Sequence, residues 1–170
     1  MRELAHRLTG AGVLVLACAA PALATPQVLE KLTYGPGRFV MFQRPMTGLW
    51  HYGDGEPPAA KVMPPKLEVT SSNNWGGYTA AWRIAGGKLL LDTISGRLDG
   101  EAVRDEALLP GKKFPVVATW FTGKLHLPIG DYNEQTQEYE FVIVFDIEKG
   151  IVQSKAMSMS ARISRTWNGR

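Results

Sequence analysis

The feature that most constrains the fold of this chain is a series of strand-length apolar runs, each ended by glycine, asparagine or aspartate. The clearest runs cover residues 78–84, 88–94, 116–127, 139–147 and 151–155. In the first of them, Tyr78, Ala80, Trp82 and Ile84 alternate with other residues, a period typical of a strand with one buried face. No amphipathic helix of about ten residues or more follows residue 25. The pattern therefore predicts an all-β fold, an antiparallel β-sandwich or β-barrel.

Two hairpins are predicted within this region. Gly86-Gly87 separates the first two runs, and glycine tolerates the positive φ angles that two-residue hairpin turns require. Residues 148–150 separate the last two runs in the same way. The run over residues 116–127 predicts a strand that is interrupted at Gly123 and ended by residues 128–130.

The remaining segments carry weaker patterns. Residues 25–65 are irregular and rich in proline and glycine, with short strands expected at 38–43 and 49–52 and at most a helical turn at 27–31. A further strand is expected over residues 97–103 and one helical turn over 105–109. Residues 25–170 are predicted to form a single domain.

The N-terminal 24 residues have the organisation of a secretory signal peptide. Arg2 and Arg7 precede an apolar stretch over residues 10–20, and Ala22-Leu23-Ala24 provides small residues for cleavage after Ala24. The apolar stretch is shorter than the roughly 20 residues that span a bilayer, so no transmembrane span is predicted. We expect an exported protein, periplasmic or secreted. Because residues 15–18 resemble a lipobox, the alternative is an inner- or outer-membrane lipoprotein anchored at Cys18.

Cysteine content and charge exclude several classes. Cys18 is the only cysteine, so cleavage after Ala24 leaves no disulfide, cysteine-ligated metal or thiol nucleophile. The net charge is only +3, and the basic residues are scattered rather than clustered. A nucleic-acid partner is therefore not expected.

One candidate binding site lies at the entry to the first strong strand. Asn73, Asn74, Trp75 and Tyr78 surround two glycines, and amides and aromatic rings suit the capture of sugars or peptides. The competing interpretation is structural: the asparagines shape a turn and Trp75 packs beneath it.

Two further candidates lie in the run over residues 116–127. Trp120 and Phe121 point to opposite faces of a strand, so if Phe121 is inward, Trp120 is exposed for binding or covers a second layer. His126 could act as a ligand or base, or lie on an exposed polar face.

Two motifs in this region resemble a known group. NNWxGYxxxWxI over residues 73–84 and WFTGxLxxPxG over residues 120–130 are similar to a group of uncharacterised bacterial exported proteins. The region that they span is about a third of the chain. The resemblance implies that these segments belong to one fold, and it implies no activity or catalytic residue.

No motif defines a reaction. The chain has no nucleophile elbow, phosphate loop or dinucleotide fingerprint, and His51 and His126 lack a partner at metal-ligand spacing. No catalytic residue, metal site or cofactor is predicted. We expect a non-catalytic binding or interaction domain of the bacterial envelope, with an envelope protein or a glycan as its ligand. The alternatives are a small periplasmic hydrolase and a lipoprotein with a structural or inhibitory role.

Overall fold

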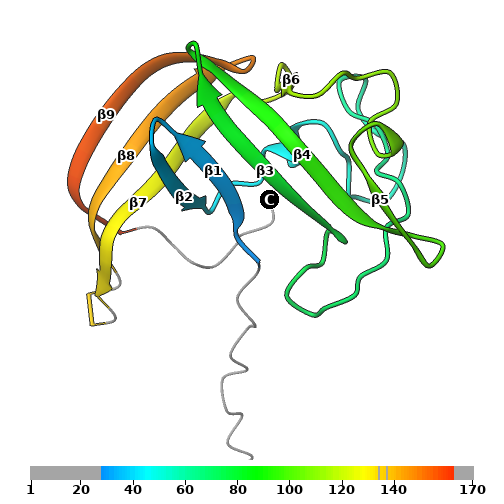
Figure 1. Ribbon diagram of the computed structural model, residues 1–170, viewed down its shortest axis with the longest axis horizontal. Coiled ribbons are helices and arrows are strands. Elements are labelled where there is room, and N and C mark those ends of the chain that lie inside the picture. Colours follow the sequence, from blue (N-terminus) through cyan, green and yellow to red (C-terminus); the bar gives the residue numbers. More distant parts are fainter. Residues whose placement is uncertain (1–27, 134, 137, 163–170) are drawn as a thin grey trace, which may run out of the picture.

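The computed structural model describes residues 28–133, 135–136 and 138–162 (Figure 1). The predicted signal peptide, Cys18 and residues 163–170 lie outside the described residues. The regular secondary structure of the described part is nearly all β, with two short 3-10 helices and no α-helix. It forms one nearly closed, barrel-shaped sheet, which confirms the predicted fold class.

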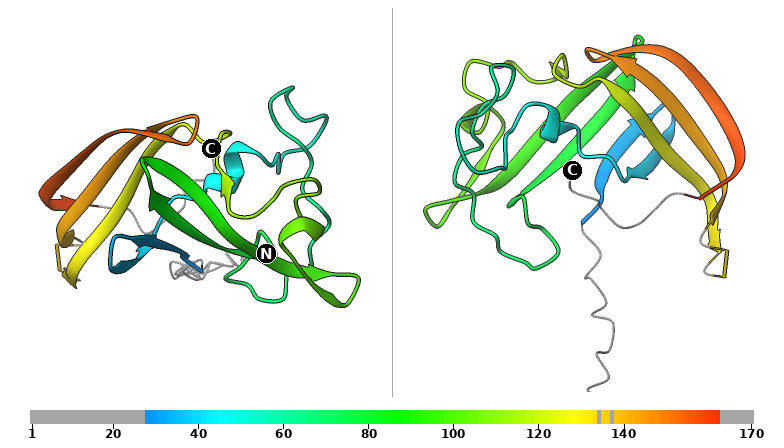
Figure 2. Two further views of the ribbon diagram at one scale, coloured as in Figure 1. Left: turned by 45° about the horizontal axis from the view of Figure 1, so that its top comes forward. Right: turned by 180° about the vertical axis from the view of Figure 1, so that it is seen from behind.

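The sheet has the strand order β2-β1-β3-β4-β9-β8-β7, with β5 and β6 also paired to β4. The pairs are antiparallel except for β1 and β3, which run parallel, so the sheet is mixed. The strand β2 comes back against β7 and nearly closes the barrel (Figures 1 and 2). The bounds are β1 (Glu30–Tyr34), β2 (Gly37–Met41), β3 (Tyr78–Ala85), β4 (Lys88–Leu98), β5 (Glu101–Arg104), β6 (Val116–Val117), β7 (Gly123–Asn133), β8 (Glu138–Glu148) and β9 (Ile151–Arg162).

Both predicted hairpins are confirmed. The turn between β3 and β4 holds Gly86 at a φ of 56° and Gly87 at 69°, conformations that an L side chain rarely adopts. The turn between β8 and β9 places Lys149 at 46° and Gly150 at 77°. In this half of the chain, the turn residues and the alternation of the strands therefore predict the same hairpins that the structure contains.

The expectations for the irregular N-terminal part were partly wrong. Residues 30–34 form β1 rather than a helical turn, because this segment pairs on one side with β2 and on the other with the distant β3. Residues 49–52 form no strand. The 3-10 helix η1 (Pro45–Gly48) precedes them, and only Trp50 makes an isolated bridge, to Val62.

Strand ends also differ from the sequence patterns. The strand β7 begins at Gly123 and continues past Gly130 to Asn133, because an irregularity after Ile129 absorbs the change in register. The strand β4 runs on to Leu98, and a turn then leads into β5, so residues 97–103 are two strands rather than one. The predicted turn at 105–109 is confirmed by the 3-10 helix η2 (Asp105–Ala107).

The core fills the concave side of the sheet. Inward residues of β3 and β4 meet those of β7 and β8, and the segment that contains η1 crosses the concavity and contributes Met46 and Trp50 (Figure 2). Trp82 lies near the centre and is 1% exposed. The fully buried larger side chains also include Leu32, Met41, Leu89, Leu91, Ile94, Leu125, Leu127, Phe145 and Ile147.

Candidate functional site

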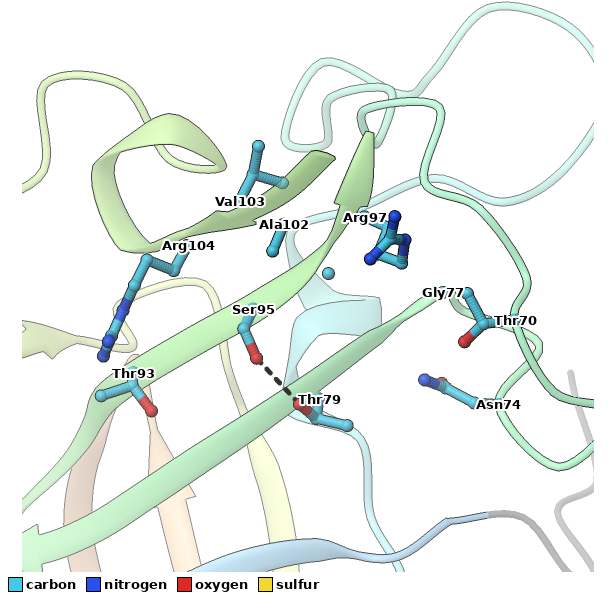
Figure 3. A pocket seen from close by; sticks show the side chains of 11 residues that line it. Thr70, Asn74, Gly77, Thr79, Thr93, Ser95, Arg97, Ala102, Val103 and Arg104 are labelled. Carbon is cyan, nitrogen blue, oxygen red and sulfur yellow. Dashed lines mark hydrogen bonds between the residues drawn. The ribbon is translucent and has the colours of Figure 1, made fainter. Parts of the chain in front are cut away.

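A polar groove of about 460 Å³ lies on the outer face of β3 and β4, where β5 folds back beside them (Figure 3). Strand alternation produces its floor. Tyr78 and Ala80 point into the core, so Thr79 points outward, and its neighbours on β4 are Ser95 and Thr93. The hydroxyls of Thr79 and Ser95 are 3.0 Å apart. The complete lining is Thr70, Asn74, Gly77, Thr79, Thr93, Ser95, Gly96, Arg97, Ala102, Val103 and Arg104.

The wall of the groove is the loop that precedes β3. Gly77 has a φ of 66°, and its carbonyl would lie 2.8 Å from a Cβ at Gly96, so both glycines allow a close approach of loop and strand. The backbone N–H of Glu68 donates to the Arg97 carbonyl at 2.9 Å and ties the loop to β4. Thr70 and Asn74 are thereby brought opposite the threonine and serine hydroxyls (Figure 3).

The two arginines of the groove already have anionic partners. Arg97 Nε lies 3.6 Å from Glu68 Oε2, and Arg104 Nε lies 3.0 Å from Asp105 Oδ2. Arg97 also donates to the carbonyl of Gly100. The groove therefore combines many neutral hydrogen-bonding groups with little uncompensated charge.

Three of the residues singled out in the sequence lie in the loop beside this groove. Asn74 lines it directly. The side chain of Asn73 accepts from Ser71 Oγ at 2.6 Å, and its carbonyl accepts from Val28 N–H at 2.7 Å, so Asn73 shapes the turn. Trp75 is 72% exposed, and its Nε1 donates to the Ser72 carbonyl at 2.5 Å. Its ring is thus held at the surface rather than packed beneath the loop.

The other three lie elsewhere. Tyr78 is buried in the barrel, and Trp120 is half-buried against the core, with its Nε1 lacking a hydrogen-bond partner. His126 lies at the seam between β7 and the end of β2. The structure therefore does not bring the six candidates together into one site.

His126 has a structural contact at this seam. The Gln43 side-chain carbonyl accepts from the His126 backbone N–H at 2.9 Å, so the amide nitrogen of Gln43 faces and donates to His126 Nδ1, also at 2.9 Å. Burial lowers the pKa of His126, and the positive charge of Lys124 lowers it further. The neutral imidazole that accepts from Gln43 is favoured, and the pair joins the two ends of the barrel sheet.

A buried ionic cluster was missed in the sequence. Glu30, on β1, is 5% exposed, accepts from Trp82 Nε1 at 2.5 Å and lies 3.5 Å from Arg44 Nε. The Arg44 guanidinium stacks over the Tyr78 ring, 4.7 Å from its centroid. Glu30 falls in a segment expected to be at most a helical turn, and Arg44 in an irregular one, so no local pattern links them.

The cluster borders a partly open hollow of about 290 Å³ between the start of β1 and the start of β3. Burial raises the pKa of Glu30, opposed by the hydrogen bond from Trp82 and the charge of Arg44. The pKa of Tyr78 is raised well above its usual value, first by burial and then by the charge of Glu30. Neither Oε1 of Glu30 nor the Tyr78 hydroxyl makes a hydrogen bond of standard geometry.

The raised pKa of Glu30 predicts a pH-dependent stability. The folded protein holds the Glu30 proton to a higher pH than the unfolded chain, so this group costs stability as the pH rises from about 4.5 through the folded pKa. The Glu30→Gln variant lacks this titration. We expect its free energy of unfolding, relative to the parent, to increase with pH over that range by about 1.4 kcal/mol per unit of pKa elevation. Urea unfolding at several pH values measures this, and a constant difference would contradict it.

A second hollow, at the end of the β7–β8 hairpin, is acidic. Asp131, Glu138 and Glu140 line it together with Tyr132 and Tyr139. Among the described residues, no three His, Cys, Asp or Glu side chains are placed to hold a metal ion. The outer groove contains no carboxylate among its lining residues.

Comparisons of the chain with protein-family models, with curated proteins and with solved structures found no match. Within the described part of the chain, no helix has the length and apolar character needed to cross a membrane.

Proposed function

We propose that this chain is an exported, non-catalytic binding domain of the bacterial envelope that holds a neutral carbohydrate in the outer groove. The observation that carries the proposal is the convergence of the Thr70, Thr79, Thr93 and Ser95 side chains and the Asn74 amide on one hollow of about 460 Å³. Hydroxyls and amides both donate and accept, as the paired hydroxyls of a sugar ring require.

Trp75 supplies the second element of carbohydrate recognition. Its ring follows Asn74 directly and is 72% exposed, while the hydrogen bond from Nε1 to the Ser72 carbonyl restricts its orientation. A fixed and exposed aromatic face stacks on the apolar face of a sugar at low entropic cost.

Charge favours a neutral ligand over an anion. Arg97 and Arg104 each pair with a carboxylate, so a phosphate or sulfate would have to compete with Glu68 or Asp105. The absence of a carboxylate among the lining residues also argues against the hydrolase alternative at this groove, because glycoside hydrolysis ordinarily uses two carboxyl groups.

The proposal is tested by calorimetric titration of the purified chain with soluble fragments of envelope glycans, neutral and carboxylated, with inorganic phosphate as the anion control. We expect binding of a neutral fragment and little response to phosphate. Thr93→Val keeps the shape of the side chain and removes one hydroxyl, so affinity should fall about fivefold, for the roughly 1 kcal/mol of one hydrogen bond.

The matched control is Thr119→Val, which changes an exposed threonine outside the groove and should leave affinity unchanged. Equal losses in both variants, or affinity for phosphate alone, would contradict a sugar site in this groove. Release of a cleaved fragment by the unmodified chain would instead support the hydrolase.

A further inference from the structure

The strand β9 presents a long unpaired edge. Its residues from Ile151 onward pair with β8, whereas on the other side only Ile151 pairs with β4, opposite Lys88, and the Val152 N–H donates to the Gly87 carbonyl at 2.9 Å. β4 then diverges from β9 toward β5, so β9, which lies between β4 and β8 in the strand order, has no paired strand along most of its β4 side (Figure 1). Among the described residues, no strand covers the remaining edge of β9.

Another margin of the sheet is capped by a side chain. The margin of β7 that faces away from β8 is capped by Gln43, which accepts from the backbone N–H of His126. Proteins usually blunt exposed edges with charge, proline or bulges. Residues 156–161 of β9 have none of these charges or prolines, and the nearest lysine, Lys155, is drawn to the Tyr34 hydroxyl at 3.1 Å.

Two exposed methionines mark the same edge. Met157 is 70% exposed and Met159 is 77% exposed. They lie opposite Ile143 and Phe141 of β8, on the same face of the sheet, so they extend an apolar stripe to the margin of the strand. Met63 is exposed to a lesser extent, 56%, in an irregular segment far from this edge in sequence.

We propose that two copies of this chain associate through β9, pairing antiparallel about a twofold axis at Ser158. In this register Met157 lies opposite Met159 of the partner subunit, and Met159 opposite the partner's Met157. Lys155 lies opposite the partner's Ala161, so no like charges face each other. The sequence of the edge is thus complementary to itself, which favours a second copy over an unrelated peptide.

The pairing joins two sheets into one and buries the methionine stripe of each copy against that of the other. It satisfies the unpaired backbone groups of both edges at once. The outer groove lies on β3, β4 and β5, away from β9, so the dimer does not depend on the proposed carbohydrate site.

The test is the mass of the purified chain in solution by light scattering over a range of concentrations. The parent should be a dimer. The variant carrying M157K and M159K places like charges opposite each other and should weaken association by 100-fold or more, whereas the control Met63→Lys should remain dimeric. The variant carrying M157K and M159E places opposite charges face to face and should recover the dimer.

Recovery by opposite charges is specific to the antiparallel register, and it also shows that charge at this edge leaves the fold intact. As a second measurement, Ser158→Cys in a chain with Cys18→Ser should form an intermolecular disulfide on mild oxidation, and Met63→Cys should not. A monomer at all concentrations, a dimer indifferent to both methionine variants, or equal crosslinking at both cysteines would overturn the proposal.

Discussion

Replacing Trp82 with alanine is expected to lower the free energy of unfolding by about 3–5 kcal/mol, the cost of deleting a large aromatic side chain from a core. Trp82 is 1% exposed and is surrounded by the inward residues of the barrel. The substitution also removes the Nε1 donor to Glu30, which leaves a buried carboxyl with one partner fewer. Urea unfolding followed by circular dichroism measures the loss.

Trp75→Ala is the matched control for this substitution. The same atoms are removed from a ring that is 72% exposed, so stability should change by no more than about 0.5 kcal/mol. The affinity for carbohydrate should nevertheless fall. A similar loss of stability in both variants would show that Trp75 is a packing residue and would remove it from the proposed binding surface.

Replacing Arg44 with methionine should cost about 3–5 kcal/mol at neutral pH, the usual result of leaving a buried charge without its partner. Arg44 lies 3.5 Å from the Glu30 carboxylate and 4.7 Å from the centroid of the Tyr78 ring. Without this cation the pKa of Glu30 rises further, because the charge of Arg44 is one of the influences that lower it. The destabilisation should therefore be smaller at pH 5 than at pH 8.

A double-mutant cycle isolates this pair. In the variant with both Arg44→Met and Glu30→Gln, no buried charge is left without a partner. Arg44→Met should therefore cost much less stability in the Glu30→Gln background than in the parent, and its cost in that background should not depend on pH. Additive losses in the cycle would show that Arg44 stabilises the fold through packing over Tyr78 rather than through its charge.

The parts of the fold that local patterns encode could be predicted from the sequence. Alternation and the paired glycines define the β3–β4 hairpin, because its two strands and the turn between them are contiguous in the chain, over residues 78–98. The pairing of β1 with β3 could not be predicted, since it joins Leu32 to Trp82 across the irregular segment. The few apolar residues of β1 are as compatible with a helical turn as with a strand.

The candidate site was predictable only in part. Asn74 and Trp75 stand out because amides, an aromatic ring and glycines adjoin at a strand entry. Thr79, Thr93 and Ser95 do not, because polar residues on the outer face of a strand are ordinary. They become a groove only when β5 and the loop over residues 67–77 fold against them. The Glu30 cluster likewise joins segments that carry no shared signal.

The central claim, that the outer groove holds a carbohydrate, is tested most directly by proton–nitrogen correlation spectra of the purified chain during titration with neutral envelope glycan fragments. The account predicts that the signals of Asn74, Thr79, Thr93, Ser95 and Ala102 shift together with a single affinity, and that the Trp75 indole signal shifts with them. Shifts confined to residues outside the groove, or no shifts with any fragment, would contradict it.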